Sequence, residues 1–315
     1  MRRHVSLLAT AFLATAAIAG EGENFHDNRG DARASLFRAD TQLSRAMTYA
    51  GPVEGFLRNA AGDVTYLHPG QEILVSRGNV AAFLKTAYSE YESNASLGLH
   101  RIAGDVSVDG TLGYTFGWLD ETRTKKGTTV VDLSYGRYLA VWRRQGREWE
   151  VETYLRLGGS APLPPPPANA LIVDGEPGVK LRDAADAHAL TATVADGRFA
   201  DSSLAQGYSV AFDKFAADAA IAITAGDIWW NRAGVNQAFA GWTPDQSLRW
   251  HPLRSGAAAS GDLAWTVGHG NFHFNVGTPT ESKSPSKYLT VWLRTPAGWR
   301  FLIDGGNSRP ADPAP

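Results

Sequence analysis

The sequence predicts two α+β domains in tandem, each with helices packed on a curved antiparallel sheet. Three observations support this fold class. Each half of the chain starts with patterns typical of helices and ends with patterns typical of strands, the two halves match one another, and a run of prolines separates them. The 315 residues are enough for two domains that each have a hydrophobic core.

The first 19 residues are typical of a secretory signal peptide. Arg2-Arg3 supply positive charge, Val5 to Ala16 form a short apolar stretch, and Ala17-Ile18-Ala19 form a small-residue cleavage site. We therefore expect a mature chain that begins near Gly20 and is periplasmic or secreted. An uncleaved N-terminal anchor is the alternative. After cleavage no stable membrane insertion is expected, because no later segment approaches the about 18 continuous apolar residues that a span needs.

Apolar side chains in the first half recur first at helical spacing and then at every second position. Helices are expected at 35–49, from Pro52 through Leu57 and at 79–88, with a short strand at 64–67. From His100 onward, the period-two pattern predicts strands separated by glycine turns at 102–108, 112–122, 129–143 and 149–157. Helices followed by an antiparallel meander form an α+β layout.

Four consecutive prolines, Pro164 to Pro167, favour an extended spacer that cannot join a sheet. We interpret 159–170 as a linker between a first domain at 20–158 and a second at 171–309, with a tail at 310–315. The two halves match in register, with Ala39-Asp40 against Ala195-Asp196, Tyr138-Leu139 against Tyr288-Leu289 and Val141-Trp142 against Val291-Trp292. Matches that stay in register across the unit indicate a duplicated domain.

The composition excludes several functions. Thirty Lys and Arg against 32 Asp and Glu give a formal net charge of -2, so the chain lacks the basic excess that favours nucleic acid as a partner. Without cysteine it has no disulfide, zinc–thiolate site or thiol nucleophile. His269 and His273 share a strand face but lie about 13 Å apart at the usual rise per residue, too far to share an ion. No metal site and no cofactor are predicted.

One helical layer covers only one face of a long curved sheet, so each sheet is expected to wrap its helices into a cone whose mouth can hold a small molecule. The order of elements, the segment 109–115 and the segment from Tyr138 to Trp149 resemble the nuclear-transport-factor-2-like superfamily, especially its SnoaL-like and ketosteroid-isomerase-like bacterial domains of unknown function. The resemblance spans nearly the whole mature chain, twice. It implies two tandem cystatin-like cones, each with about three helices on a curved antiparallel sheet. It does not specify an activity, because this superfamily includes isomerases, polyketide cyclases, epoxide hydrolases, dehydratases and binding modules.

The resemblance also implies catalytic positions in the first domain. Ketosteroid-isomerase-like enzymes carry a carboxylate base just before a proline at the end of the first strand, and His68 occupies that place. A neutral imidazole can accept a proton at neutral pH. The oxyanion donor of the family matches Tyr138, and Asp120 can orient His68 or act as a base itself. The alternatives are an exposed strand end for His68, a core position for Tyr138 and a solvated carboxylate for Asp120.

Both copies depart from this enzyme pattern. The first helix of the first copy has about Ser44 where the isomerases carry a tyrosine, and in the second copy Thr224 replaces the histidine and is no general base. We therefore expect neither steroid isomerisation nor this mechanism in the second cone. Large aromatic side chains suit a partly apolar ligand, although a packed core explains them nearly as well. The candidate ligand-binding residues are Tyr66, Trp118, Trp142, Trp265, Tyr288 and Trp292.

Three functional hypotheses follow. The first is an exported protein that binds a small, partly apolar molecule in one or both cones. The second is an isomerase, dehydratase or cyclase that acts on a carbonyl substrate in the first domain, with His68 as base and Tyr138 as donor. The third is an assembly module whose cones pair through the outer faces of their sheets, as an internal pseudo-dimer or as a homodimer.

Overall fold

The computed structural model describes residues 25–170, 185–243 and 245–311. The expected signal peptide at 1–19, the expected start of the second domain at 171–184 and most of the tail lie outside these residues. Within the described part of the chain, two units follow one another with the same order of helices and strands. The predicted α+β fold class is therefore confirmed.

The first domain forms one six-stranded sheet in the order β2-β1-β6-β5-β4-β3. Neighbouring strands are antiparallel except β1 and β6, which pair in parallel. Its elements are α1 (Phe25–Tyr49), α2 (Pro52–Asn59), β1 (Ala60–Leu67), β2 (Leu74–Val75), α3 (Arg77–Ala87), β3 (Ser96–Val106), β4 (Leu112–Thr124), β5 (Val131–Gln145) and β6 (Glu148–Gly159).

The second domain repeats this arrangement with the sheet order β8-β7-β12-β11-β10-β9 and one parallel pair, β7 with β12. Its elements are α4 (Ala185–Gln206), α5 (Tyr208–Phe215), β7 (Ala216–Ile223), β8 (Ile228–Trp230), α6 (Asn231–Phe239), β9 (Ser247–Ala257), β10 (Leu263–Phe274), β11 (Ser282–Thr295) and β12 (Gly298–Ser308).

Helix α1 begins ten residues before the expected Ser35, at Phe25. The added turns are mostly polar, and a buried ion pair connects them to the sheet, with Arg29 Nη2 2.7 Å from Asp105 Oδ2. A long-range partner of this kind gives no signal in local periodicity. At the other end of the helix, Gly51 has a φ of 84°, a conformation that glycine adopts without strain, and α2 starts at the next residue.

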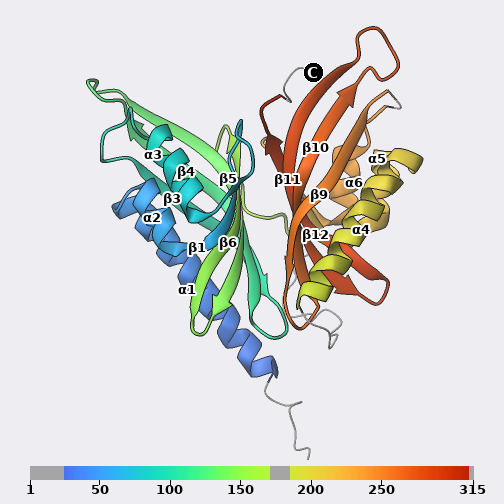
Figure 1. The fold of residues 1–315 in the computed structure, drawn as a ribbon, viewed down its shortest axis with the longest axis horizontal. Coiled ribbons are helices and arrows are strands. Elements are labelled where there is room, and N and C mark those ends of the chain that lie inside the picture. The colour runs from blue at the N-terminus through green and yellow to red at the C-terminus, as the bar shows by residue number, and fades with distance from the viewer. Residues whose placement is uncertain (1–24, 171–184, 244, 312–315) are drawn as a thin grey trace, which may run out of the picture.

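The helices cover the outer faces of the two sheets, and the sheets stand between the helical layers (Figure 1). Each domain has one hydrophobic core between its helices and its sheet. A third core joins the two sheets and contains Tyr114, Phe116, Val267, Leu289 and Val291. The two domains of one chain therefore bury the backs of their sheets against each other.

Polar contacts cross the same boundary at the hairpin turns. The backbone N–H of Ser260 donates to Asp109 Oδ2 at 2.8 Å, and that of Val108 donates to Asp262 Oδ2 at 2.9 Å. Each domain thus supplies a carboxylate that accepts a hydrogen bond from the other. None of the described helices is long and apolar enough to cross a membrane.

Candidate functional site

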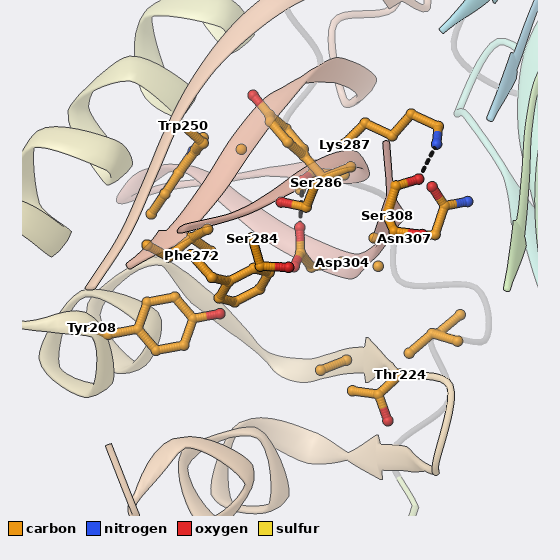
Figure 2. A pocket seen from close by; sticks show the side chains of 18 of the residues that line it. Tyr208, Thr224, Trp250, Phe272, Ser284, Ser286, Lys287, Asp304, Asn307 and Ser308 are labelled. Atoms are coloured by element: carbon orange, nitrogen blue, oxygen red, sulfur yellow. Dashed lines mark hydrogen bonds between the residues drawn. The ribbon is translucent and has the colours of Figure 1, made fainter. Parts of the chain in front are cut away.

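A cavity of about 390 Å³ lies between the helices and the sheet of the second domain. This volume is within the usual range for small-molecule sites. Figure 2 shows Tyr208, Trp250 and Phe272 on one side of it, Lys287 and Ser308 on the other, and Asp304 between them. Its aromatic wall consists of Phe199, Tyr208, Phe212, Phe239, Trp250 and Phe272.

Asp304 is the ionisable group on the floor of the cavity. It stands on β12, and Oδ1 accepts a hydrogen bond of 2.5 Å from the Thr290 hydroxyl on β11. Burial raises the pKa of Asp304 to about 7, with Asp196 adding a smaller contribution of the same sign. The carboxyl group therefore exists in both protonation states near neutral pH.

Asp196 is the second carboxyl group of this cone and is fully buried on α4. Tyr288 donates its hydroxyl to Oδ2 at 2.7 Å, and the Trp250 indole N–H donates to Oδ1 at 2.8 Å. Burial raises the pKa of Asp196, against the opposing effect of these hydrogen bonds. Because the Tyr288 hydroxyl is engaged with Asp196, Tyr288 presents mainly its ring to the cavity.

The corresponding space in the first domain is filled by side chains. By strand register, Tyr154 and Arg156 on β6 hold the places of Asp304 and Gly306 on β12. Arg156 Nη2 lies 2.6 Å from Glu121 Oε2, in an ion pair to which Tyr88 adds its hydroxyl. Tyr154 also stacks on Tyr66 with ring centroids 5.5 Å apart, where the second domain has Ala222. The second cone is open because Asp304 and Gly306 stand in place of Tyr154 and Arg156, and Ala222 stands in place of Tyr66.

The chain matches no protein-family model and no curated protein sequence. In structure it is similar to a nuclear transport factor 2-like superfamily protein from Salmonella enterica, with 14% identity and a TM-score of 0.35, over 45% of this chain and 99% of that chain. It is also similar to a ketosteroid isomerase-like protein from Erwinia carotovora, with 16% identity and a TM-score of 0.33, over 44% of this chain and 99% of that chain. A third similar structure is an NTF2-like protein with a cystatin-like fold from Novosphingobium aromaticivorans, with 20% identity and a TM-score of 0.31, over 41% of this chain and 84% of that chain.

Three helices on a curved six-stranded sheet, in the same element order twice, define the architecture. Both domains share this architecture, which agrees with the fold that the resemblance of the sequence to the nuclear-transport-factor-2-like superfamily implied. The fold by itself assigns no chemistry, because function depends on the side chains in each cone.

His68 and Tyr138 lie on the helix side of the first domain. The His68 ring packs on Tyr66 and Phe83, its Nδ1 lies 3.0 Å from the Pro69 carbonyl oxygen, and burial lowers its pKa to about 4, with Arg156 acting in the same direction. Tyr138 is fully buried, and its hydroxyl donates to Asp40 Oδ1 at 3.1 Å. Tyr138 is thus a core residue whose donor already has a partner.

Asp120 does not reach His68. Because Leu119 and Glu121 face the helices, Asp120 lies on the opposite face of β4, where it pairs with His100. Trp118 lies on that face too and stacks on the His100 ring at 3.6 Å. Asp120 and Trp118 therefore stand outside the cone, which corrects the expectation that they act within it.

The other candidate ligand-binding residues separate into three groups. Trp142 and Trp292 are fully buried and donate their indole N–H groups to threonine hydroxyls at 2.8 Å, so they belong to the core. Trp265 faces the first domain and donates to Glu152 at 3.3 Å. Tyr66 fills the first cone, and Tyr288 lines the open cavity of the second.

Sequence reasoning missed Asp196 and Asp304. The repeated Ala-Asp pair that aligned the two domains was a signal for Asp196, because a carboxylate on a buried helix face needs partners. Asp304 gave a weaker signal, because the ladder between β11 and β12 shifts register between Val291 and Trp292, so strict alternation does not assign its face. Among the described residues, no group of three or more His, Asp or Glu side chains is arranged to hold a metal ion.

Proposed function

We propose that the protein binds a small, partly apolar molecule in the cone of its second domain. The main support is the cavity of about 390 Å³, which combines an aromatic wall with the half-buried carboxyl group of Asp304. Apolar walls provide affinity for such a ligand, and a few polar groups orient it. The signal-like pattern of the first 19 residues supports a further proposal, that binding takes place outside the cytoplasm.

A substitution that fills the cavity tests this proposal. In Ala222→Tyr, the cavity-lining alanine of β7 takes the residue that stands at the matching place in the first domain. The matched control is Asp218→Tyr on the same strand, where the side chain is 90% exposed. Native mass spectrometry then compares co-purifying molecules, and ligand-observed NMR compares the binding of 2-phenylethanol.

We expect the wild type and Asp218→Tyr to retain a bound molecule or the probe, and Ala222→Tyr to lose it. Equal binding by all three proteins contradicts the proposal, and so does the absence of binding in the wild type. Circular dichroism verifies that Ala222→Tyr is folded.

Proton transfer in the same cavity is a second candidate function. It is favoured by the pKa of Asp304, near 7, because a general acid or base works best when its pKa is close to the working pH. Tyr208, on α5, lines the cavity near this carboxyl group, and burial raises its pKa well above the usual value. A probe reaction is exchange of the α-protons of 4-phenyl-2-butanone for deuterium, followed by NMR. Equal exchange rates with wild type and Asp304→Asn contradict this function.

We propose no reaction for the first domain, because large side chains fill the interior of its cone beside His68 and Tyr138. Tyr154 and Arg156 occupy the interior, and the Tyr138 hydroxyl is bonded to Asp40. For the assembly hypothesis, we propose that the pairing is internal, between the two sheets of one chain, because the core between them draws on both.

A further inference from the structure

Among the described residues, the cone of the second domain holds two carboxyl groups and no cation paired with either of them. Asp304 interacts with the Thr290 hydroxyl and with Asp196, and Asp196 accepts hydrogen bonds from Tyr288 and Trp250. These donors are neutral in the described structure. A buried carboxylate that has only neutral partners retains much of its desolvation penalty.

The first domain shows what the second has lost. There Asp40 lies 2.9 Å from Arg101 Nη1, and Glu121 is paired with Arg156. By strand register, Arg101 corresponds to Pro252 and Arg156 to Gly306. Both arginines of the first cone are therefore absent from the second, while the carboxyl group on the first helix is retained and Asp304 is added.

Lys287 is the one Lys or Arg among the described residues that line the cavity, and its ammonium group is directed elsewhere. Lys287 is fully buried, and its ammonium group donates to the Ser308 carbonyl oxygen at 2.6 Å and to the His68 carbonyl oxygen at 2.8 Å. Figure 2 shows this side chain extending away from Asp304. Lys287 thus connects the domains, and in the part of the chain that the structure describes it does not pair with the carboxyl groups of the cone.

The wall of the cavity has the other feature that suits a cation. Phe212 and Phe239 pack with ring centroids 4.4 Å apart, Tyr208 lies 4.7 Å from Phe239, and Trp250 and Phe272 also border the space. Aromatic faces attract ammonium groups, more strongly where water is excluded. The Asp304 carboxyl group on the floor and the aromatic rings on the wall both favour positive charge.

We propose that the second cone selects molecules that carry a protonated amine on an aromatic or aliphatic body. The ammonium group binds beside Asp304, and the apolar body packs against the aromatic wall. This inference rests on the proposed ligand-binding function and specifies the chemical class of the ligand.

Three probes with the same phenyl body test this selectivity: 2-phenylethylamine, 2-phenylethanol and phenylacetate, each titrated into the full chain by isothermal calorimetry. At pH 8, we expect the ammonium compound to bind at least tenfold more tightly than the alcohol, and the carboxylate to bind most weakly. Asp304→Asn should weaken binding of the amine at least tenfold and change binding of the alcohol less than twofold. The control Asp218→Asn removes an exposed carboxylate from the same domain and should change neither.

The pH dependence gives an independent readout. The groups near Asp304 are Asp196 from α4, Tyr208 from α5 and Tyr288 from β11, and both tyrosines stay protonated because burial raises their pKa well above the usual value. Because the pKa of Asp304 is about 7, its ionised fraction rises about 30-fold from pH 5.5 to pH 8. Affinity for the amine should rise with it, while affinity for the alcohol stays constant.

The outcomes separate this inference from the proposed function. If the alcohol binds and Ala222→Tyr abolishes its binding, but the amine has no advantage, the cavity is a binding site and the inference about amines is wrong. Tighter binding of phenylacetate than of the amine, or an unchanged preference in Asp304→Asn, also overturns it. If no probe binds in a manner that Ala222→Tyr abolishes, both proposals fail.

Discussion

Replacement of Asp304 by asparagine should remove one contribution to the pH dependence of the protein's stability, a contribution that favours the folded state at low pH. The pKa of this carboxyl group rises from 3.8 to about 7 on folding, because burial disfavours the charged form. The folded state therefore holds this proton more tightly than the unfolded state, and the stability that protonated Asp304 contributes is lost as the pH rises from 4 to 8. A pKa difference of this size corresponds to at most about 4 kcal/mol of the free energy of unfolding, and to about 2 kcal/mol if water in the cavity halves the desolvation.

Urea unfolding of wild type and Asp304→Asn at pH 4, 6 and 8 measures this effect. We expect the free energy of unfolding of the variant, relative to the wild type, to increase by about 2 to 4 kcal/mol from pH 4 to pH 8. Lys287, whose pKa burial lowers to about 7, titrates in both proteins, so the comparison isolates Asp304.

Asp213 provides a control of opposite sign. Hydrogen bonds from Arg232 and Asn236 lower its pKa to about 2, so the stability that it contributes is present above pH 4 and is lost only as the pH falls towards 2. Asp213→Asn should therefore differ from the wild type by a constant amount between pH 5 and pH 8. If the stability curves of wild type and Asp304→Asn are parallel from pH 4 to pH 8, the Asp304 carboxyl group is not desolvated, and our account of the cavity is wrong.

Three further predictions concern the first domain and the contact between the domains. Arg156→Met leaves the Glu121 carboxylate buried without its cation and should lower the free energy of unfolding, measured in urea, by about 3 to 5 kcal/mol. Addition of Glu121→Gln should restore most of this stability. A double variant that is no more stable than Arg156→Met argues against a buried ion pair. Arg29→Ala should accelerate hydrogen exchange in the first two turns of α1 and leave exchange in α3 unchanged, because Asp105 connects that end of α1 to the sheet; unaltered exchange would mean that the pair does not hold the helix. Sedimentation of the wild type should give a compact monomer, because each sheet already covers the other. Val291→Asp places a charge in the core between the sheets and should sediment as a less compact protein. A concentration-dependent dimer, or equal sedimentation of the wild type and this variant, contradicts internal pairing.

Local patterns predicted much of the fold. The α2 helix follows a glycine at positive φ and begins with a proline, and both features are readable in the sequence. The strands follow period-two alternation between glycine turns, as at Gly110 and Gly146, which both adopt positive φ. The early start of α1 was not predicted, because the Arg29–Asp105 pair joins residues 76 positions apart.

The candidate site was harder to predict than the fold. Resemblance drew attention to His68 and Tyr138 in the first domain, but the open cavity lies in the second. The reason is a set of volume changes in matched positions, such as Tyr66 to Ala222 and Arg156 to Gly306. Each change is visible in the aligned halves, yet its effect depends on which side chains share one interior.

The amino-acid sequence alone determined the duplication, the order of helices and strands in each domain and the absence of thiol chemistry, because these depend on composition and on neighbours along the chain. The tertiary structure decided which cone is open, which face of β4 carries Asp120 and which carboxyl groups lack a cation. Those properties depend on register shifts and on side chains brought together from helices and strands far apart in the chain. Burial and charge compensation arise only where such side chains meet, so no local pattern specifies them.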